Sequence, residues 1–382
     1  MGQPRLLFVV NVDWFFLSHR LPIALAAQRA GYEVHLATAL TGREAELKSH
    51  GIVVHPLEMS RSGTNPLAEL ATLFRLFRII RRARPHLLHT VTIKPVLYGG
   101  LLARILRIPN LAAISGLGYL FTGRTSLLRG LATRLYRLVL GHTRSWVVVQ
   151  NVEDRKIVAH SFGVPQRRIH LIDGSGVDLQ AYPTSPEPEG PPVVTMAARL
   201  LRDKGVMEFC AAAALVRQSH PEAKFLLAGD LDPGNPASLV QADLDALARE
   251  GHVQSIGHCH DIPGLFSRSH LVVLPSYREG LPKVLVEAAA CGRPVVTTDV
   301  PGCRDAVLPG ETACLVPARE VAGLVQAIIG LLDSPDRRRK MGERGRRLVE
   351  ERFDIRIVVR QHLELYDLMA AGKSAECELT AQ

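Results

Sequence analysis

Residues Tyr277–Val296, YREGLPKVLVEAAACGRPVV, contain the pattern that decides the fold. Gly280 and Pro282 predict a turn that leads into a helix, because proline is tolerated in the first helical turn. Gly292 predicts the end of that helix. Apolar runs at 270–276 and 294–298 flank the helix and predict two strands. A strand, a helix and a second strand in this order indicate parallel strands in a sheet covered by helices.

The same stretch places Glu279 and Glu287 eight positions apart. If the helix were continuous between them, they would lie roughly 12 Å apart along its axis and toward one face. The helix N-terminus could hold a phosphate. One carboxylate could then bind a sugar hydroxyl and the other a ribose hydroxyl. The alternative is an amphipathic helix with two solvated glutamates. The residues predicted to bind a donor at this junction are Gly280, Leu281, Pro282, Lys283 and Val284.

Alternating apolar runs and amphipathic stretches continue along the whole chain of 382 residues. They predict seven strands in the first half and six in the second, with helices between most of them. This alternation favours two doubly wound α/β domains. The predicted strands are 5–11, 33–38, 52–57, 87–91, 111–115, 146–150, 169–172, 193–197, 224–228, 253–256, 271–274, 294–298 and 313–316.

The domain boundaries follow from composition. Residues 181–192, AYPTSPEPEGPP, form a proline-rich stretch, which predicts an interdomain linker. We therefore expect an N-terminal domain at 1–180 and a C-terminal domain at 193–355. A last helix is expected at 356–371, and the short polar tail at 372–382 is expected to lack structure.

The pieces E-G-L-P, E-A-x-A-C-G and P-V-V-x-[ST]-D of the quoted region closely resemble the signature of retaining glycosyltransferase family 4. The resemblance extends over nearly the whole chain. It implies the GT-B fold, in which two Rossmann-like domains face each other across a cleft and the final helix crosses back to the first domain. It also implies transfer of a hexose or N-acetylhexosamine from a nucleotide-diphosphate sugar, with UDP as the expected nucleotide and with retention of configuration.

The resemblance implies a role for each matching residue. Glu279 would hold the transferred sugar and Glu287 the ribose. Arg199 and Lys204, five positions apart after a predicted strand, would clamp the diphosphate, whose negative charge grows as it leaves. The turn that contains Gly257, His258 and Ile262 resembles the place where the family's backbone meets the nucleotide base. On their own, an Arg and a Lys at this spacing are more often ordinary surface charge; the Glu279/Glu287 element in the same domain favours the diphosphate clamp instead.

Three segments of the first half match a subgroup that extends polyprenyl-diphosphate-linked saccharides in O-antigen, capsule or glycan assembly. They are Arg20-Leu21-Pro22, His89–Lys94 and Ile114–Gly118. An acceptor of that kind is therefore expected, bound by the N-terminal domain. The alternative for each histidine or lysine is a structural hydrogen bond. The residues assigned to the acceptor are His19, Arg20, His89, Lys94, Gly116 and Gly118.

Two departures from the family's pattern lie in the first half. Asp13, Trp14 and Phe15 stand where many relatives carry a glycine-rich loop, which puts phosphate contacts from that loop in doubt. Ser115 stands where many relatives carry a histidine, which removes one candidate for proton transfer.

The net charge of +9 is unevenly distributed. Residues 1–186 carry 23 Lys and Arg against 10 Asp and Glu, and the remainder carries 23 against 27, so the two parts differ as +13 and −4. The basic residues gather at 74–84 and 122–138, between leucines and aromatics. This pattern is typical of a helix at an anionic membrane surface, and equally of a Rossmann helix with a solvated basic face. Binding to nucleic acid is disfavoured because leucine stands where stacking aromatics would be needed.

The sequence contains no apolar run of the ~20 residues that a spanning helix needs and no signal-peptide pattern. We therefore expect a cytoplasmic protein, peripheral at the inner face of the membrane. Six scattered cysteines without metal-ligand spacing predict free thiols. The pairs Asp230/Asp232 and Asp243/Asp245 are interpreted as surface carboxylates, so no metal and no cofactor are expected. The alternatives are an epimerase or a soluble glucan-type synthase of the same fold, and a basic nucleic-acid-binding protein.

Overall fold

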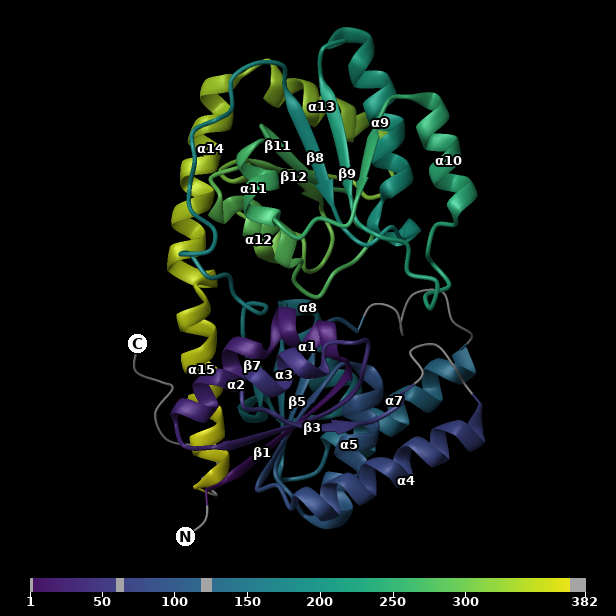
Figure 1. Ribbon diagram of the computed structural model, residues 1–382, viewed down its shortest axis with the longest axis vertical. Coiled ribbons are helices and arrows are strands. Elements are labelled where there is room, and N and C mark those ends of the chain that lie inside the picture. Colours follow the sequence, from purple (N-terminus) through teal and green to yellow (C-terminus); the bar gives the residue numbers. More distant parts are fainter. Residues whose placement is uncertain (1–2, 60–64, 118–125, 372–382) are drawn as a thin grey trace. The chain divides into compact units, whose positions relative to one another are not determined.

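The computed structural model describes residues 3–59, 65–117 and 126–371, with the side chains of 126–128 left out. The chain divides into two compact units, residues 1–175 with 356–382, and residues 176–355 (Figure 1). Each unit has its own parallel sheet and hydrophobic core. The two doubly wound α/β sheets predicted from the sequence are confirmed.

The N-terminal unit is built on a seven-stranded parallel sheet in the order β3-β2-β1-β4-β5-β6-β7. Its central strands β4, β5 and β6 are buried along their whole length, as expected for a parallel sheet covered by helices. The strands are β1 Arg5–Val12, β2 Glu33–Ala39, β3 Val53–Pro56, β4 Leu87–Val91, β5 Asn110–Ile114, β6 Ser145–Val149 and β7 Ile169–Leu171. The helices are α1 Asp13–His19, α2 Leu21–Arg29, α3 Glu44–Ser49, α4 Pro66–Ala83, α5 Ile93–Leu106, α7 Ser126–Leu140, α8 Val152–Phe162, the 3₁₀ turn Gln166–Arg168 and α15 Ile355–Ala370.

The C-terminal unit is built on a six-stranded parallel sheet in the order β10-β9-β8-β11-β12-β13. The strands are β8 Val193–Ala197, β9 Lys224–Ala228, β10 Gln254–Gly257, β11 Leu271–Leu274, β12 Val295–Thr298 and β13 Ala313–Val316. The helices are η2 Arg202–Lys204, α9 Val206–Ser219, α10 Gln241–Glu250, α11 Ile262–Ser267, α12 Lys283–Ala290, η3 Arg304–Ala306, α13 Val321–Leu332, α14 Pro335–Leu348 and the π-helical turn η4 Val349–Phe353. All thirteen predicted strands are found in the described residues, within one residue at each end.

Helix α15 follows the C-terminal unit in sequence but packs into the core of the N-terminal unit. Its residues Val358, Leu365 and Tyr366 lie in the same buried cluster as Leu6 and Phe8 of β1. The apolar face of α15 therefore completes a core that the first 175 residues leave open.

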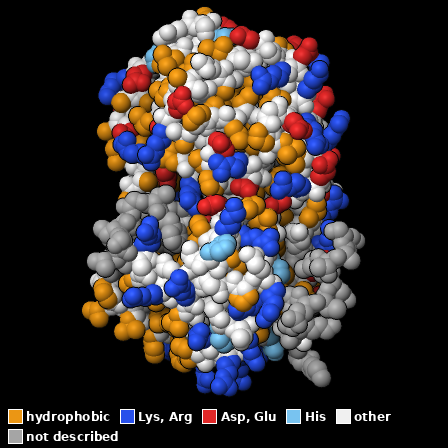
Figure 2. All heavy atoms as spheres, turned by 180° about the vertical axis from the view of Figure 1, so that it is seen from behind, with side chains coloured by type: hydrophobic (Ala, Val, Ile, Leu, Met, Phe, Trp, Pro, Cys, Tyr) orange, Lys and Arg blue, Asp and Glu red, His pale blue; other side chains and the backbone are white. Residues whose placement is uncertain are grey.

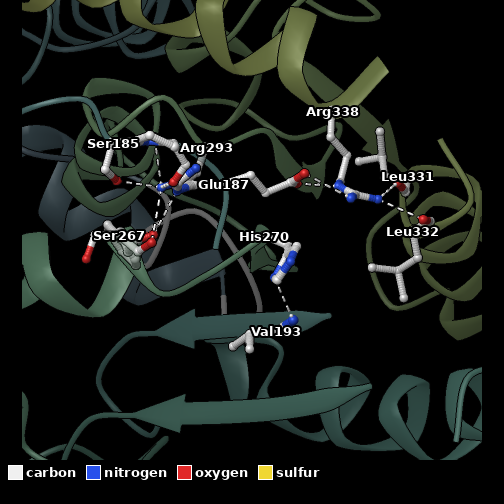
Figure 3. Close-up of polar contacts among 11 residues, drawn as sticks. Ser185, Glu187, Val193, Ser267, His270, Arg293, Leu331, Leu332 and Arg338 are labelled. Carbon is white, nitrogen blue, oxygen red and sulfur yellow. Dashed lines mark hydrogen bonds and ion pairs between the residues drawn. The ribbon is translucent and has the colours of Figure 1, made fainter. Parts of the chain in front are cut away.

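The proline-rich stretch lies within the C-terminal unit, whereas the division between the units falls at 175/176 and 355/356. Arg293, which is 3% exposed, donates to the carbonyl oxygens of Ser185 (3.1 Å) and Pro186 (2.8 Å) and to Ser185 Oγ (2.6 Å) (Figure 3). Arg338 pairs with Glu187 at 2.5 Å. Two buried guanidinium groups need acceptors, and this stretch supplies them, so a composition typical of a linker forms a fixed part of the unit instead.

Helices α4 and α7 of the N-terminal unit each expose a second apolar stripe. In α4 the residues Leu67, Leu70 and Phe74 are exposed, while Leu76 and Ile80 pack on the sheet. In α7 the exposed residues are Leu131, Leu135 and Leu138. No helix in the described ranges is long and apolar enough to cross a bilayer.

Candidate functional site

The candidate site of the C-terminal unit lies at the carboxyl ends of β8 and β11. These strands are hydrogen-bonded neighbours at the centre of the sheet, where the strand order reverses. In open α/β sheets the loops that leave two such strands diverge and leave room for a ligand. Arg199 and Lys204 follow β8, and Glu279 follows β11.

Lys204 and Glu279 meet directly in an ion pair between Nζ and Oε1. Their side chains are 18% and 11% exposed, so water screens the pair only partly. The loops that carry them are also tied together by their backbones. The N–H of Tyr277 donates to the carbonyl oxygen of Asp203 (2.9 Å), and Ser276 Oγ donates to the same oxygen (3.1 Å).

Gly205 makes this approach of the two loops possible. Its φ is +76°, and a Cβ at this position would lie 2.2 Å from the carbonyl oxygen of Pro275. Any other residue would therefore push η2, which ends at Lys204, away from the loop that follows β11.

The loop that carries Glu279 packs against the turn after β12 and is hydrogen-bonded to it. The N–H of Glu279 donates to the carbonyl oxygen of Pro301 (3.3 Å). Gly302 has a φ of +83°, and a Cβ there would lie 2.5 Å from the carbonyl oxygen of Glu279 and 2.6 Å from that of Gly280. The backbone of Gly302 therefore packs so closely against the Glu279 loop that no side chain fits between them.

We expect Gly302→Ala to displace the Glu279 loop and to lower both stability and turnover. The strained φ and the clash together are expected to cost about 1–3 kcal/mol of unfolding free energy. The matched control is Gly310→Ala, since Gly310 also has a positive φ (+77°) but nothing within 4 Å of its added Cβ. Thermal unfolding and initial rates of both variants test this. Equal losses of activity in the two variants would contradict the role of Gly302.

Helix α12 begins at Lys283, with Pro282 as its N-cap and no side-chain cap. Glu279 therefore lies in the preceding loop, on the other side of the predicted loop-to-helix junction from Glu287, so the roughly 12 Å spacing of a continuous helix does not apply to the pair. Pro282 fixes the entry into the helix one residue later than expected, within the usual spread of helix ends. The side chains of Leu281 and Val284 pack against the core, so they face away from a ligand at the helix N-terminus.

Glu287 lies one turn into α12 and is 8% exposed. Its Oε1 accepts a hydrogen bond from the hydroxyl of Tyr182 at 2.6 Å and lies 3.1 Å from Nζ of Lys283. The carboxylate is thus held in one orientation by two donors. The interpretation of Glu287 as a solvated glutamate on a helix surface is wrong.

Arg199 is the exposed member of the group. Its Nη1 donates to Oδ2 of Asp232 at 2.8 Å, and 42% of its side chain is exposed. Among the described residues its ion pair is with Asp232, and not with Glu279. Asp232, which the sequence analysis interpreted as a surface carboxylate, is only 11% exposed and orients this guanidinium.

The residues expected at the nucleotide base lie at the same edge of the sheet, from the last residue of β10 to the start of α11. His258 Nδ1 pairs with Oδ2 of Asp230 at 2.8 Å, and the carbonyl oxygen of Gly257 accepts from the N–H of Gly229 (2.8 Å). Ile262 begins α11 and packs partly against the core. His258 is therefore accessible, whereas Ile262 can offer mainly its backbone.

In the N-terminal unit, Arg20 and His89 are not on a surface. Arg20 is 2% exposed and His89 is fully buried, with its Nδ1 2.6 Å from the hydroxyl of Tyr366 in α15. Burial lowers the pKa of Arg20 to about 10 and the pKa of His89 well below its ordinary value. The expectation that these two side chains touch an acceptor is not met in this structure, because buried side chains cannot reach a ligand from solvent.

The remaining residues expected at the acceptor lie on different elements: His19 ends α1, Lys94 lies in the first turn of α5, and Gly116 follows β5. Lys94 Nζ pairs with Oε1 of Glu69 at 2.5 Å, and the hydroxyl of Tyr98 donates to Oε2 of the same carboxylate at 2.5 Å. His19 Nδ1 lies 2.6 Å from Ser18 Oγ, and its ring stacks on Phe15. Gly116 has a φ of +118° just after β5, and Gly118 lies outside the described residues.

Asp13 takes the place of the family's glycine-rich loop and has a structural role. It is fully buried and accepts from the N–H of Thr41 (2.6 Å), the hydroxyl of Thr41 (2.5 Å) and the N–H of Arg43 (3.3 Å). The first turn of α1 is thus fixed to the loop after β2.

The partners that orient the site were not predicted from the sequence. Tyr182 and Asp232 lie 105 and 33 positions from the residues they contact, so no local spacing connects them. Glu69 is likewise 25 positions from Lys94. The sequence shows that Gly205 and Gly302 follow strands. It does not show that carbonyl oxygens of other loops leave no room for a Cβ at these two positions. Among the described residues, no group of three or more His, Cys, Asp or Glu could hold a metal ion.

Comparisons with known proteins agree with this architecture. A glycosyl transferase 4-like family model matches residues 5–149, and a glycosyl transferases group 1 model matches residues 181–348. The N,N'-diacetylbacillosaminyl-diphospho-undecaprenol alpha-1,3-N-acetylgalactosaminyltransferase of Campylobacter jejuni is 28% identical and covers 92% of this chain and 97% of its own length.

Two further proteins share more distant similarity. The UDP-Gal:alpha-D-GlcNAc-diphosphoundecaprenol alpha-1,3-galactosyltransferase of Escherichia coli is 22% identical over 70% of this chain and 71% of its own length. The structure of a sucrose-phosphate synthase from Thermosynechococcus elongatus superposes with a TM-score of 0.79 at 22% identity, covering 97% of this chain and 100% of that one.

The fold and these matches define a glycosyltransferase with the GT-B fold. More particularly, the chain belongs to the group 1 glycosyltransferases, with a glycosyltransferase 4-like N-terminal half. The fold, the family and the enzyme class predicted from the sequence are confirmed.

Proposed function

We propose that this protein transfers a hexose or N-acetylhexosamine from a UDP-sugar to a polyprenyl-diphosphate-linked saccharide, with retention of configuration. The observation that carries the donor assignment is the contact between Lys204 and Glu279 at the carboxyl ends of two central strands. The acceptor assignment is supported by the relative from Campylobacter jejuni, whose name states an undecaprenyl-diphosphate-linked substrate. The UDP assignment is supported by the name of the Escherichia coli relative.

In the proposed mechanism, Glu279 holds the sugar while Lys204 and Arg199 hold the diphosphate. An ammonium group has three N–H donors, and Lys204 uses one on Glu279, so it can hold a phosphate oxygen as well. Arg199 has further N–H groups besides the one that donates to Asp232. Both cations would stabilise the leaving diphosphate more as its charge increases.

The proposed chemistry needs no enzyme nucleophile. The acceptor hydroxyl oxygen forms a bond to the anomeric carbon on the face from which the diphosphate departs. The bond between that carbon and the β-phosphate oxygen breaks, and its electron pair leaves with UDP. The proton of the acceptor hydroxyl passes to a phosphate oxygen of the leaving group. With two cations and the N-terminus of α12 near the diphosphate, we propose that transfer requires no metal.

The test is a binding and product assay with purified protein. A thermal-shift panel of UDP, GDP, ADP and their sugars identifies the donor, because a ligand of the folded state raises stability by RT ln(1 + [L]/Kd). Product analysis with a lipid-linked saccharide acceptor and EDTA then tests transfer, anomeric configuration and metal dependence. No transfer, or an inverted linkage, would refute the proposal. Conversion of the UDP-sugar without an acceptor would favour an epimerase.

We further propose that the protein works at the cytoplasmic surface of a membrane, docked through α4 and α7. The exposed leucines and Phe74 of these helices lie among arginines that have few acidic neighbours. Figure 2 shows many Lys and Arg side chains on the N-terminal unit and both signs of charge on the C-terminal unit. An apolar stripe beside basic residues complements a bilayer with anionic headgroups.

We expect Leu70→Ser with Phe74→Ser to weaken binding to vesicles that contain phosphatidylglycerol. Each of these side chains contributes up to roughly 1.5–3 kcal/mol when buried, so a loss of tenfold or more in partitioning is expected. Leu215→Ser is the matched control, since Leu215 is an exposed leucine of α9 in the C-terminal unit. Sedimentation with vesicles, with and without phosphatidylglycerol, measures the effect. Unchanged partitioning of the double variant would exclude α4 as the docking surface.

A further inference from the structure

Glu287 receives a hydrogen bond from a residue that lies far away in sequence. Tyr182 stands in the proline-rich stretch 181–192, and its hydroxyl donates to Oε1 of Glu287 at 2.6 Å. Lys283, one turn earlier on α12, contacts the same oxygen at 3.1 Å. Both contacts fall on Oε1, and within the described residues none is found to Oε2. The second oxygen is therefore left to accept from a ligand.

Tyr182 is itself held firmly. Its N–H donates to the carbonyl oxygen of Asp178 at 3.1 Å. Arg346 Nη1 donates to the carbonyl oxygen of Tyr182 at 2.8 Å and to that of Ala290, the last residue of α12, at 2.9 Å. Arg346 thus ties the tyrosine to the far end of the helix that carries Glu287. The ring packs partly against the core, so it has little freedom to rotate.

The hydroxyl of Tyr182 acts as a permanent donor. Burial, and next the nearby Glu287 carboxylate, raise the pKa of this tyrosine well above its ordinary value. A phenol that stays protonated donates to a carboxylate at every pH at which the protein functions. Such a charge-assisted bond in a nearly buried site strongly restricts the orientation of the carboxylate.

We infer that Tyr182 is a positioning residue that turns Oε2 of Glu287 toward a ribose hydroxyl, and so gives the site its preference for ribonucleotides over deoxyribonucleotides. The inference rests on the proposed function, in which Glu287 binds the ribose. It extends that function to a residue which never touches the sugar nucleotide.

The experiment measures Kd for UDP, 2'-deoxy-UDP and 3'-deoxy-UDP by calorimetry on wild type, Tyr182→Phe, Glu287→Ala and the double variant. Wild type is expected to bind UDP at least about 10-fold more tightly than one of the two deoxy analogues. That analogue lacks the hydroxyl that would donate a hydrogen bond to the charged Glu287. In Tyr182→Phe this preference is expected to fall to about 2-fold or less, while the affinity for that analogue stays unchanged. In the Glu287→Ala background, the tyrosine substitution is expected to have no further effect.

Tyr98→Phe is the matched control, since Tyr98 also donates to a carboxylate, that of Glu69 at 2.5 Å, in the other unit. It is expected to keep the full preference for UDP. If Tyr182→Phe retains the wild-type preference, or weakens all three ligands equally, the positioning role is wrong. A wild-type protein that binds no uridine nucleotide would instead refute the proposed function.

Discussion

Replacing Glu279 with Gln is expected to lower the turnover number of sugar transfer by about 10²–10³-fold, the range seen when one preorganised electrostatic contact is removed from an active site. Glutamine keeps the size of the side chain but cannot balance the charge of Lys204, which is the partner of Glu279 in the structure. The released ammonium would then be fully available to phosphate. We therefore expect Kd for UDP to stay the same or to decrease while kcat falls.

Lys204→Ala, unlike Glu279→Gln, is expected to weaken the binding of UDP as well as to lower kcat. Without the ammonium, UDP loses a charge-assisted contact, so its Kd is expected to rise about 10-fold or more, and kcat falls as well. Isothermal calorimetry with UDP and initial rates with the UDP-sugar separate the two effects. Circular dichroism and thermal unfolding establish that both variants fold, because removing one member of a largely buried pair can itself destabilise a protein.

The neighbouring pair Arg202 and Asp243 supplies the control. Arg202 lies in the same η2 turn as Lys204, and its Nη2 is 2.9 Å from Oδ2 of Asp243, but 54% of its side chain is exposed. Exposed pairs contribute roughly 0–1 kcal/mol, so Arg202→Ala is expected to change kcat by about 2-fold at most. If Glu279→Gln changes kcat no more than Arg202→Ala does, the role of Glu279 in transfer is refuted.

The sequence predicted the strands well because period and composition are local properties. Each of the thirteen strands is a short apolar run bounded by turn residues, and such runs are readable without tertiary information. The proline-rich stretch shows the limit of this reasoning. Its composition is typical of a linker, but Arg293 and Arg338 bind its backbone and Glu187, and no local pattern reports contacts with residues more than 100 positions away.

The sequence identified the residues of the candidate site, but it predicted their positions and contacts only in part. The spacing of Glu279 and Glu287 and the loop-to-helix junction between them were predicted, and the helix starts at Lys283, within one residue of the expected position, because element ends also depend on tertiary packing. Arg20 and His89 were assigned to an acceptor on resemblance alone. Their burial follows from α15, whose Tyr366 lies 277 positions from His89, and no property of the segments 19–22 or 89–94 indicates that helix.

Two buried histidines, His89 in β4 and His362 in α15, predict that the N-terminal unit loses stability as the pH falls below about 6.5. His89 and His362 are both fully buried, their rings stack at 5.6 Å, and Arg20 adds a positive charge nearby. Burial first, and then the neighbouring charges, lower the pKa of His89 well below 6.5 and that of His362 to about 3. Among the described residues, the groups that face the pair include Arg20, Tyr366 and the ring of Phe8, and none of these three carries a carboxylate.

The direction of the effect follows from where protons bind. In the unfolded chain both histidines take up a proton as the pH falls through about 6.5, whereas in the folded chain they stay neutral. The stability they contribute is therefore complete above pH 6.5 and is lost progressively between 6.5 and the folded pKa, which for His362 is about 3. At pH 5 His362 is expected to cost about 2 kcal/mol, and His89 lowers the stability in the same direction.

His362→Leu tests this, because leucine fills the buried site without titrating. Nδ1 of His362 lies 2.8 Å from the carbonyl oxygen of Val358, one turn earlier in the same helix, so losing this bond breaks no hydrogen bond between elements. The substitution does replace the stacking of His362 on His89 with an apolar contact. Urea unfolding at pH 7.5 and pH 5 is expected to show a loss smaller by about 2 kcal/mol in the variant than in wild type. Carboxylates titrate equally in both proteins and cancel in the comparison. Equal losses in the two proteins would mean that His362 accepts a proton in the folded state, and the buried cluster would then have to open at pH 5.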